Sequence, residues 1–178
     1  RLQGHPNMND TPGVDMSTGS LGQGVSTAVG MALAAKKFGD TYRTYALLGD
    51  GEIEEGQVWE AAMFAGNHEL DNLTLIIDNN GLQLDGPLEQ INSPVPIGEK
   101  FRAFKFHVIE VADGSDFDQL RAAFSEARTV KGHPTVIVAH TIKGKGVSFM
   151  EGQVGWHGKA PNDGQFAQGM AELEKEAE

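Results

Sequence analysis

Residues 42–81 read YRTYALLGDGEIEEGQVWEAAMFAGNHELDNLTLIIDNNG, and this stretch decides the fold. It opens with a run of little charge, residues 42–48, which we expect to be a buried strand. Residues 52–68 place apolar side chains at helical spacing, and residues 73–77 form a second, continuously apolar strand. A strand, a helix and a strand in this order predict two parallel strands joined by a right-handed crossover.

The rest of the chain continues the alternation of strands and helices. We expect a helix over 17–39 capped by Ser17 or Ser20, strands at 106–111 and 135–139, a helix over 116–130, and a charged terminal helix over 164–178. In the helix over 116–130, the inward-facing side chains should be Phe117, Leu120, Phe124 and Ala127. This pattern predicts an α/β fold, a mostly parallel twisted sheet with helices on both faces.

Composition narrows the function classes. The chain has 178 residues with 14 Lys+Arg and 25 Asp+Glu, a formal net charge of −11. This acidic balance argues against nucleic acid or an anionic membrane as a partner, because both bind basic surfaces. Cysteine is absent, which excludes disulfides, thiolate nucleophiles and cysteine-based metal sites. No apolar run is long enough to span a membrane and no signal peptide opens the chain, so the cytoplasm is the expected compartment.

The length fits one domain, and we expect a single domain over residues 1–178. Residues 1–16 are mostly polar and contain two prolines and several turn residues, so we expect an irregular segment there. A domain rarely begins with a polar loop that has nothing before it to pack on. We therefore expect this domain to be truncated at its amino-terminal side, as a fragment or a subunit.

Two polar side chains follow the two strands of the deciding stretch. Asp50 comes after the first strand and Asn80 after the second, and the carboxyl ends of parallel strands lie at one edge of the sheet. Carboxylate and amide oxygens without Cys or His beside them suit a hard cation, Mg²⁺ or Ca²⁺, and Mg²⁺ is usually completed by phosphates and water. Gly51 lets a backbone N–H approach a phosphate, and the start of the next helix favours an anion there. The residues thus predict a Mg²⁺–diphosphate site, although either motif by itself is usually a plain turn.

Four short motifs in order carry a resemblance to a known family. They are Gly4-His5-Pro6, STGSLGQG at 17–24, Gly49-Asp50-Gly51 with Asn79-Asn80, and HGKAP at 157–161. The third resembles the thiamine diphosphate-binding motif, which opens with GDG and closes with NN. Together the four resemble transketolase, from about residue 4 to about residue 163. The similarity is greatest to the amino-terminal, diphosphate-binding subunit of the split bacterial transketolases.

The resemblance implies a site for thiamine diphosphate and Mg²⁺. The implied metal ligands are the side chains of Asp50 and Asn80 and the backbone carbonyl of Leu82. The implied cofactor contacts are Gly51 and His157 at the diphosphate, Leu84 and Ile142 beside the thiazolium ring, and Gly19 and Leu21 near the aminopyrimidine. Gly49 is also expected among the cofactor-binding residues. His5 and His157 match histidines of the substrate channel, where a group that titrates near pH 7 can transfer protons.

Acidic and basic residues beside the motifs are less decisive. Glu52, Glu54, Glu55 and Glu60 lie in one predicted helix, and several of them are expected on a solvated face or as first-turn acids favoured by the helix dipole. Glu55 and Glu60 also match carboxylates at the family's dimer interface. Residues 143–146, KGKG, are equally well a phosphate contact or a basic turn.

The resemblance also implies a function. A transketolase moves a two-carbon ketol unit between sugar phosphates, and this chain would need a partner with the pyrimidine-binding domain, whose carboxylate acts on the aminopyrimidine. Association into a homo-oligomer is also expected, since the family's active sites form between chains. Two alternatives stay open: another thiamine diphosphate enzyme, such as deoxyxylulose-phosphate synthase or a dehydrogenase E1 component, or a non-catalytic truncated relative or assembly subunit.

Overall fold

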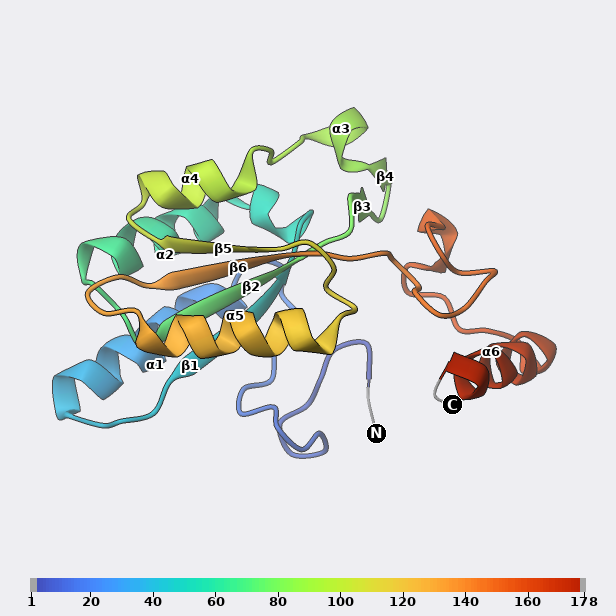
Figure 1. Ribbon diagram of the computed structural model, residues 1–178, viewed down its shortest axis with the longest axis horizontal. Helices are drawn as coiled ribbons and strands as arrows, with labels where there is room; N and C mark the ends of the chain where they lie inside the picture. Colours follow the sequence, from blue (N-terminus) through green and yellow to red (C-terminus); the bar gives the residue numbers. More distant parts are fainter. Residues whose placement is uncertain (1–2, 177–178) are drawn as a thin grey trace.

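The computed structural model describes residues 3–176, so the outermost residues of the predicted irregular start and of the predicted terminal helix lie outside the described part. Figure 1 shows the arrangement. The elements are α1 (Gly24–Phe38), β1 (Thr44–Gly49), the 3-10 turn η1 (Glu52–Glu54), α2 (Gly56–Asn67), β2 (Leu73–Asn79), β3 (Leu82–Gln83), β4 (Gly86–Pro87), α3 (Leu88–Ile91), α4 (Ile97–Ala103), β5 (His107–Val111), α5 (Phe117–Thr129), β6 (Thr135–His140), the 3-10 turn η2 (Val154–Trp156) and α6 (Asp163–Glu176).

The main sheet has four parallel strands in the order β1-β2-β6-β5. In its register Gly49 lies opposite Asp78, and Asn79 lies opposite His140, so β1, β2 and β6 end at one common edge. The β3–β4 hairpin and the segment over residues 141–176 leave the sheet from this carboxyl edge (Figure 1). The predicted mostly parallel sheet and the pairing of the first two strands are confirmed.

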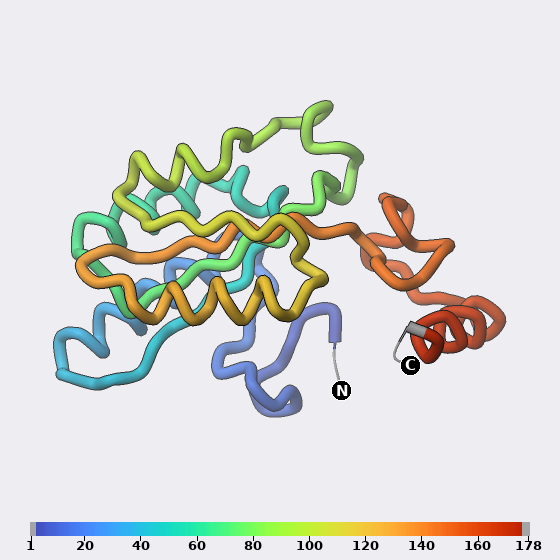
Figure 2. The backbone as a smooth tube through the Cα atoms, in the orientation of Figure 1, coloured from blue at the N-terminus to red at the C-terminus, as the bar shows by residue number. Residues whose placement is uncertain are grey.

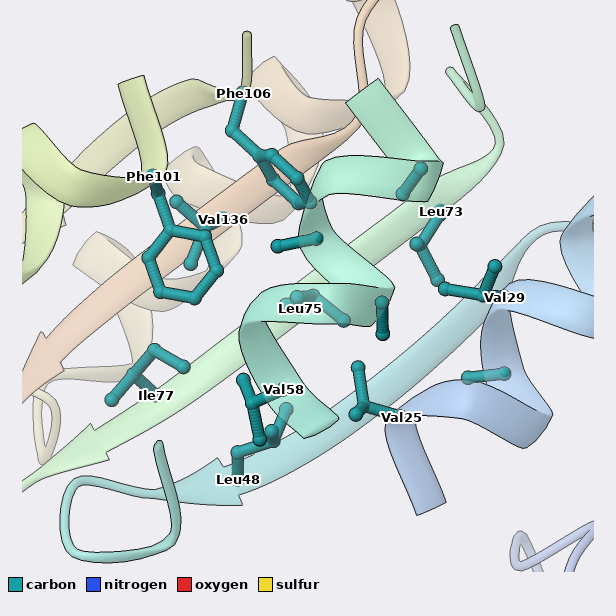
Figure 3. Close-up of a cluster of buried hydrophobic side chains, with 14 of the residues drawn as sticks. Val25, Val29, Leu48, Val58, Leu73, Leu75, Ile77, Phe101, Phe106 and Val136 are labelled. Carbon is teal, nitrogen blue, oxygen red and sulfur yellow. The ribbon is translucent and has the colours of Figure 1, made fainter. Parts of the chain in front are cut away.

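Helices cover both faces of the sheet, as predicted. Leu73, Leu75 and Ile77 of β2 pack with the buried side chains of α1, α2 and α4 in one cluster, which Figure 3 shows in close-up. On the other face, Ile137 and Ala139 of β6 pack against α5. Neighbouring residues of a strand point to opposite faces of the sheet, and successive residues of β6 therefore belong alternately to the two clusters.

Strand β1 differs from the prediction, because it is an edge strand with one face open. Thr44 and Leu48 are buried, but Tyr45 is 41% and Leu47 is 72% exposed. A run of low charge is compatible with burial on one face or on both, so the pattern alone did not separate the two cases.

The first helix begins later than predicted, at Gly24 instead of residue 17. Gly22 has a φ of 75°, a left-handed conformation that a helix cannot contain. Neither predicted serine caps the helix: its N-cap is Gln23, and the Ser17 hydroxyl instead accepts a hydrogen bond from the Met8 N–H at 3.0 Å. Residues 17–23 therefore form a loop beside the carboxyl edge.

The predicted helix over 52–68 is broken into two elements. The turn η1 ends at Glu54, the next residue, Glu55, has an extended ψ of 128°, and α2 starts at Gly56. The chain after Asp50 therefore makes a separate tight turn before the helix begins. This turn is where two glutamates approach the site described below.

Helix α5 starts one residue later than the prediction, behind an aspartate cap. The Asp116 carboxylate accepts hydrogen bonds from the N–H groups of Asp118 at 2.8 Å and Gln119 at 3.2 Å. Phe117 was predicted to face inward but is 72% exposed, because it occupies the first position after the cap and lies off the face that Ala123 and Ala127 turn toward the sheet.

We expect Asp116→Ala to lower the melting temperature at pH 7. Hydrogen bonds from Gln119 and Asp118 hold the pKa of the Asp116 carboxyl below its ordinary value. A carboxyl with a lowered pKa stabilises the fold above its unfolded pKa of about 3.9 and loses this effect as the pH falls through the lower, folded value. Thermal denaturation between pH 7 and pH 3 should therefore show the difference between wild type and variant shrinking. Asp118→Ala, which removes a surface carboxylate paired with Arg121, is the control, and an equal loss there would contradict the assignment.

The segment between β2 and β5 was not assigned from the sequence. It contains β3, β4, α3 and α4, which are short and are interrupted by Pro87, Pro94 and Pro96. Helix α4 nevertheless supplies Phe101, a fully buried side chain of the main core (Figure 3).

The predicted charged terminal helix is present as α6, and Figure 2 shows residues 141–176 running out past the carboxyl edge. Among residues 3–176, none of the helices combines the length and the apolar character needed to cross a membrane.

Candidate functional site

The loops after β1 and β2 meet at the carboxyl edge, as the sequence predicted. Asp50 follows β1 and is 1% exposed. Its Oδ2 atom accepts a hydrogen bond of 2.5 Å from the Gly81 N–H in the loop after β2, and its Oδ1 atom accepts one of 2.9 Å from the Gly51 N–H. The Asp50 N–H in turn donates to the carbonyl of Asp78 at 3.2 Å. Residues far apart in the sequence thus share one small polar site.

Asp50 is an acid in an environment that disfavours its charge. Burial raises the pKa of the Asp50 carboxyl and the Asp78 carboxylate raises it further, whereas backbone N–H groups of Gly81, Gly51 and Asn80 partly offset this. A buried carboxylate of this kind gains from a cation placed beside it, since the cation favours the ionised form.

The other two predicted metal ligands lie in the loop that Asp50 contacts. The amide oxygen of Asn80 accepts a hydrogen bond from the Leu82 N–H at 3.0 Å, and Leu82 opens the β3–β4 hairpin. Within residues 3–176, no group of three or more His, Cys, Asp or Glu side chains is placed to hold a metal ion. One carboxylate, one amide and one backbone carbonyl are hard oxygen donors, which fit Mg²⁺ or Ca²⁺ if phosphate and water complete the shell.

Gly51 is required by close packing at this point. A Cβ atom on Gly51 would lie 2.8 Å from the Cβ of Gln83, closer than real side chains approach. Gly51 therefore lets the loop after β1 lie directly against the β3–β4 hairpin. Its neighbour Gly49 donates its N–H to the Glu52 carboxylate at 3.0 Å. The two glycines of this motif that were predicted to bind the cofactor thus line the same turn as Asp50.

The loop over residues 17–23 lies next to this turn. The Gly22 N–H donates to the Glu52 carboxylate at 2.9 Å, which links the loop to the turn that carries Asp50. His5 packs against Gly19, since a Cβ on Gly19 would lie 3.1 Å from the His5 ring. His5, one of the two predicted substrate histidines, therefore lies on a segment next to the loop that carries Gly19 and Leu21, the predicted aminopyrimidine contacts.

A cavity of about 860 Å³ lies between residues 4–21, α1 and β1. Its lining includes His5, Gly19, Leu21 and Glu52, but neither Asp50 nor Asn80. The cavity thus reaches the turn after β1 through Glu52, and its lining includes neither the predicted metal ligands nor any residue of the loop after β2.

The loop after β6 is tied to the end of β2. The Thr141 hydroxyl donates to the Asp78 carboxylate, and the Thr141 N–H donates to the Asn79 carbonyl at 3.2 Å. Along this loop, the Nζ atom of Lys143 lies 3.3 Å from the Nδ1 atom of His157. The loop that carries His157 therefore begins at the carboxyl edge, where Thr141 holds it. Lys143, which the sequence assigned equally to a phosphate contact or to a basic turn, contacts His157, a predicted site residue.

Three predicted cofactor contacts are apolar and exposed. The exposed fractions are 61% for Leu21, 60% for Leu84 and 49% for Ile142. They lie on three separate loops around the carboxyl edge. Leu21 is in the loop before α1, Leu84 is in the turn between β3 and β4, and Ile142 is in the loop after β6. Apolar side chains in such positions offer surface for an apolar ring or for another chain.

Sequence reasoning missed the roles of two glutamates in η1. Glu52 was expected on a solvated face or as a first-turn acid; it is an acid in the first turn of η1, but it is half-buried and accepts hydrogen bonds from the N–H groups of Gly22 and Gly49. Glu54 accepts from the Gln83 side-chain amide at 3.0 Å. Their position directly after the Gly-Asp-Gly turn was the available signal, but it could be used only if the break before α2 had been foreseen.

Comparison with known proteins gave consistent matches. Residues 1–175 match the family model described as "Transketolase, thiamine diphosphate binding domain". The chain is 46% identical to the 6-deoxy-6-sulfo-D-fructose transketolase subunit of Clostridium sp. strain MSTE9, over 98% of this chain and 63% of that protein. It is 40% identical to an apulose-4-phosphate transketolase subunit of Phocaeicola vulgatus, over 99% of this chain and 62% of that protein.

A solved structure of similar fold is the transketolase of Campylobacter jejuni. It superposes with a TM-score of 0.87 at 34% identity and covers 96% of this chain and 28% of its own. The chain therefore spans less than two thirds of the length of each of these proteins.

Proposed function

Because this chain belongs to the transketolase family and carries its thiamine diphosphate-binding domain, we propose that it binds thiamine diphosphate with Mg²⁺ and takes part in transketolase chemistry. In this proposal the domain over 1–178 is the diphosphate-binding part of a split enzyme. The observation that carries it is the contact between the buried Asp50 carboxylate and Gly81 N–H, which joins the two loops of the cofactor motif.

The metal would be held by Asp50, Asn80 and the carbonyl of Leu82. Asp50 supplies the negative charge, and its burial favours a cation beside it. The Asn80 amide oxygen has a second lone pair besides the one that accepts from Leu82, so it can bind a cation without losing that bond. Diphosphate oxygens and water would complete the octahedral shell that Mg²⁺ requires.

The remaining residues would orient the cofactor and the substrate. We assign Gly49, Gly51 and His157 to the diphosphate, Leu84 and Ile142 to the thiazolium ring, and Gly19 and Leu21 to the aminopyrimidine. His5 and His157 would exchange protons with sugar oxygens, because a histidine can accept and release a proton near neutral pH. Lys143, which lies 3.3 Å from His157, adds positive charge beside the place assigned to the diphosphate.

When bound, thiamine diphosphate supplies the nucleophilic carbon and the electron sink for cleavage of a carbon–carbon bond. This chain would hold the diphosphate end, and a pyrimidine-domain partner would supply the carboxylate for the aminopyrimidine. The similar proteins named as subunits support such a partner. Self-association and a cytoplasmic location belong to the same proposal.

The proposed reaction is transfer of a two-carbon ketol unit from a ketose to an aldose phosphate. Two similar proteins are named for 6-deoxy-6-sulfo-D-fructose and for apulose 4-phosphate, compounds that carry an anionic sulfonate or phosphate group. We therefore propose a sugar with a terminal anionic group, and a sugar phosphate in the first instance, as the substrate class.

A reconstitution assay tests this proposal. The chain is mixed with a pyrimidine-domain transketolase subunit, thiamine diphosphate, Mg²⁺ and an aldose phosphate acceptor, and the donors are a ketose phosphate, apulose 4-phosphate and 6-deoxy-6-sulfo-D-fructose in parallel. We expect a ketose two carbons longer than the acceptor, formed only when both chains and both cofactors are present. Turnover of a 2-oxo acid donor instead would indicate a different thiamine diphosphate enzyme, and cofactor binding without any turnover would favour the non-catalytic alternative.

A further inference from the structure

We propose that Glu52 is a positioning residue that fixes the loop over residues 17–23 against the turn that carries Asp50. The inference rests on the proposed function, because it assigns the two connected loops to opposite ends of one cofactor. Glu52 itself is not placed at the metal or at the cofactor. Its role would be to set the distance between the residues that hold the diphosphate and those that hold the aminopyrimidine.

The two oxygens of one carboxylate make the connection. Oε1 of Glu52 accepts the Gly22 N–H at 2.9 Å, and Oε2 accepts the Gly49 N–H at 3.0 Å. Gly49 is the last residue of β1, directly before Asp50, whereas Gly22 lies in the loop that precedes α1. Hydrogen bonds to an ionised acceptor are stronger than those between neutral groups, so this carboxylate is a firm link between the loops.

The conformation of Gly22 supports this role. Its φ is 75°, and a Cβ there would lie 2.8 Å from the Cβ of Glu55. The loop therefore approaches the residue just after η1 at a position where a side chain would not fit, and the Gly22 N–H donates to Glu52. Close approach and a charged acceptor at the same residue indicate a built contact and not an accidental one.

The neighbouring Glu54 provides a matched comparison. It belongs to the same 3-10 turn and is also half-buried, but it accepts from the Gln83 side chain at 3.0 Å instead of from Gly22. A glutamine at position 54 would keep an oxygen to accept that bond. Glu54→Gln thus removes the same charge as Glu52→Gln without breaking the link to the loop over 17–23.

The test compares Glu52→Gln with Glu54→Gln in the full chain. The Gly22 and Gly49 N–H groups each face a different oxygen of Glu52. In Glu52→Gln one of these oxygens becomes an NH2 group, which is a donor facing a donor, so the carboxylate bridge between the loop and β1 is broken. We expect hydrogen exchange of a peptide covering residues 17–25 in the cofactor-free chain to quicken about tenfold in Glu52→Gln and to stay unchanged in Glu54→Gln. Glu52→Asp, which keeps the charge but is too short to reach both donors, should behave like Glu52→Gln.

Two probes then separate the ends of the cofactor. Inorganic pyrophosphate with Mg²⁺ occupies only the metal–diphosphate end, whereas thiamine diphosphate with Mg²⁺ uses both. In calorimetric titrations we expect Glu52→Gln to weaken thiamine diphosphate about tenfold and pyrophosphate less than about twofold.

The possible results are distinguishable. Equal losses for both probes, or the same losses in Glu54→Gln, would overturn the role of Glu52 and leave the proposed function intact. A wild-type chain that binds neither probe would overturn the proposed function and this inference with it.

Discussion

Asp50→Asn is expected to raise the Kd for thiamine diphosphate, measured in the presence of Mg²⁺, at least about 100-fold. Removing a group that only supports a metal ligand typically costs about 10–100-fold in affinity, and we assign Asp50 to the metal directly. The variant keeps the size of the side chain but removes the only charge among the three proposed ligands. Calorimetric titration of wild type and variant, each with Mg²⁺ and with a chelator, measures the effect.

The control for this variant is Asp118→Asn. It also removes one carboxylate, but from the exposed surface of α5, where Asp118 pairs with Arg121 at 2.9 Å. It should bind the cofactor as wild type does. Circular dichroism must show that Asp50→Asn is folded, and a folded variant with unchanged Mg²⁺-dependent binding would contradict the assignment of Asp50 to the metal.

Gly66→Ala is expected to destabilise the chain by about 3 kcal/mol. Gly66 lies in α2, and a Cβ on it would be 1.9 Å from the backbone carbonyl oxygen of Phe104, just after α4. That oxygen belongs to the main chain and cannot rotate away, so α2 and α4 would have to separate. Both helices pack against the buried side chains of β2, and Phe101 of α4 is part of this core cluster (Figure 3). Urea denaturation measures the loss.

Gly30→Ala is the matched control, because it makes the same change in α1 at a position with no atom within 4 Å of the added Cβ. Alanine is a better helix former than glycine, so this variant should be more stable than wild type by about 0.5–1 kcal/mol. The two substitutions are therefore expected to have opposite signs. A Gly66→Ala chain as stable as Gly30→Ala would mean that α2 and α4 do not pack as described.

Much of the site followed from the order of elements along the chain. Two apolar strands with a helix between them fix a parallel pair, and a parallel pair brings Asp50 and the loop of Asn80 to one edge. The hydrogen bond between Asp50 and Gly81 confirms that these two loops meet. Their meeting could be predicted without knowing any other part of the fold. The later strands, with Ile137 and Ala139 on one face and Val136 and Val138 on the other, were also clear because their apolar runs are continuous.

Other features depended on contacts that a local pattern does not contain. The open face of β1, with Leu47 72% exposed, depends on which strand lies at the edge of the sheet. The break at Glu55 and the bonds from Glu52 to Gly22 and Gly49 depend on a loop that comes earlier in the chain. Short elements such as the β3–β4 hairpin carry too few residues for a period to be recognised.

We have proposed that the loops after β1 and β2 together hold a divalent cation and a diphosphate. A crystal of the chain grown with Mn²⁺ and thiamine diphosphate tests it most directly, because the anomalous signal of manganese locates the cation. We expect a single strong peak about 2.1 Å from a carboxylate oxygen of Asp50, the amide oxygen of Asn80 and the carbonyl oxygen of Leu82, with diphosphate oxygens completing the shell. Bound diphosphate with the manganese peak elsewhere on the chain, away from Asp50 and Asn80, would contradict it.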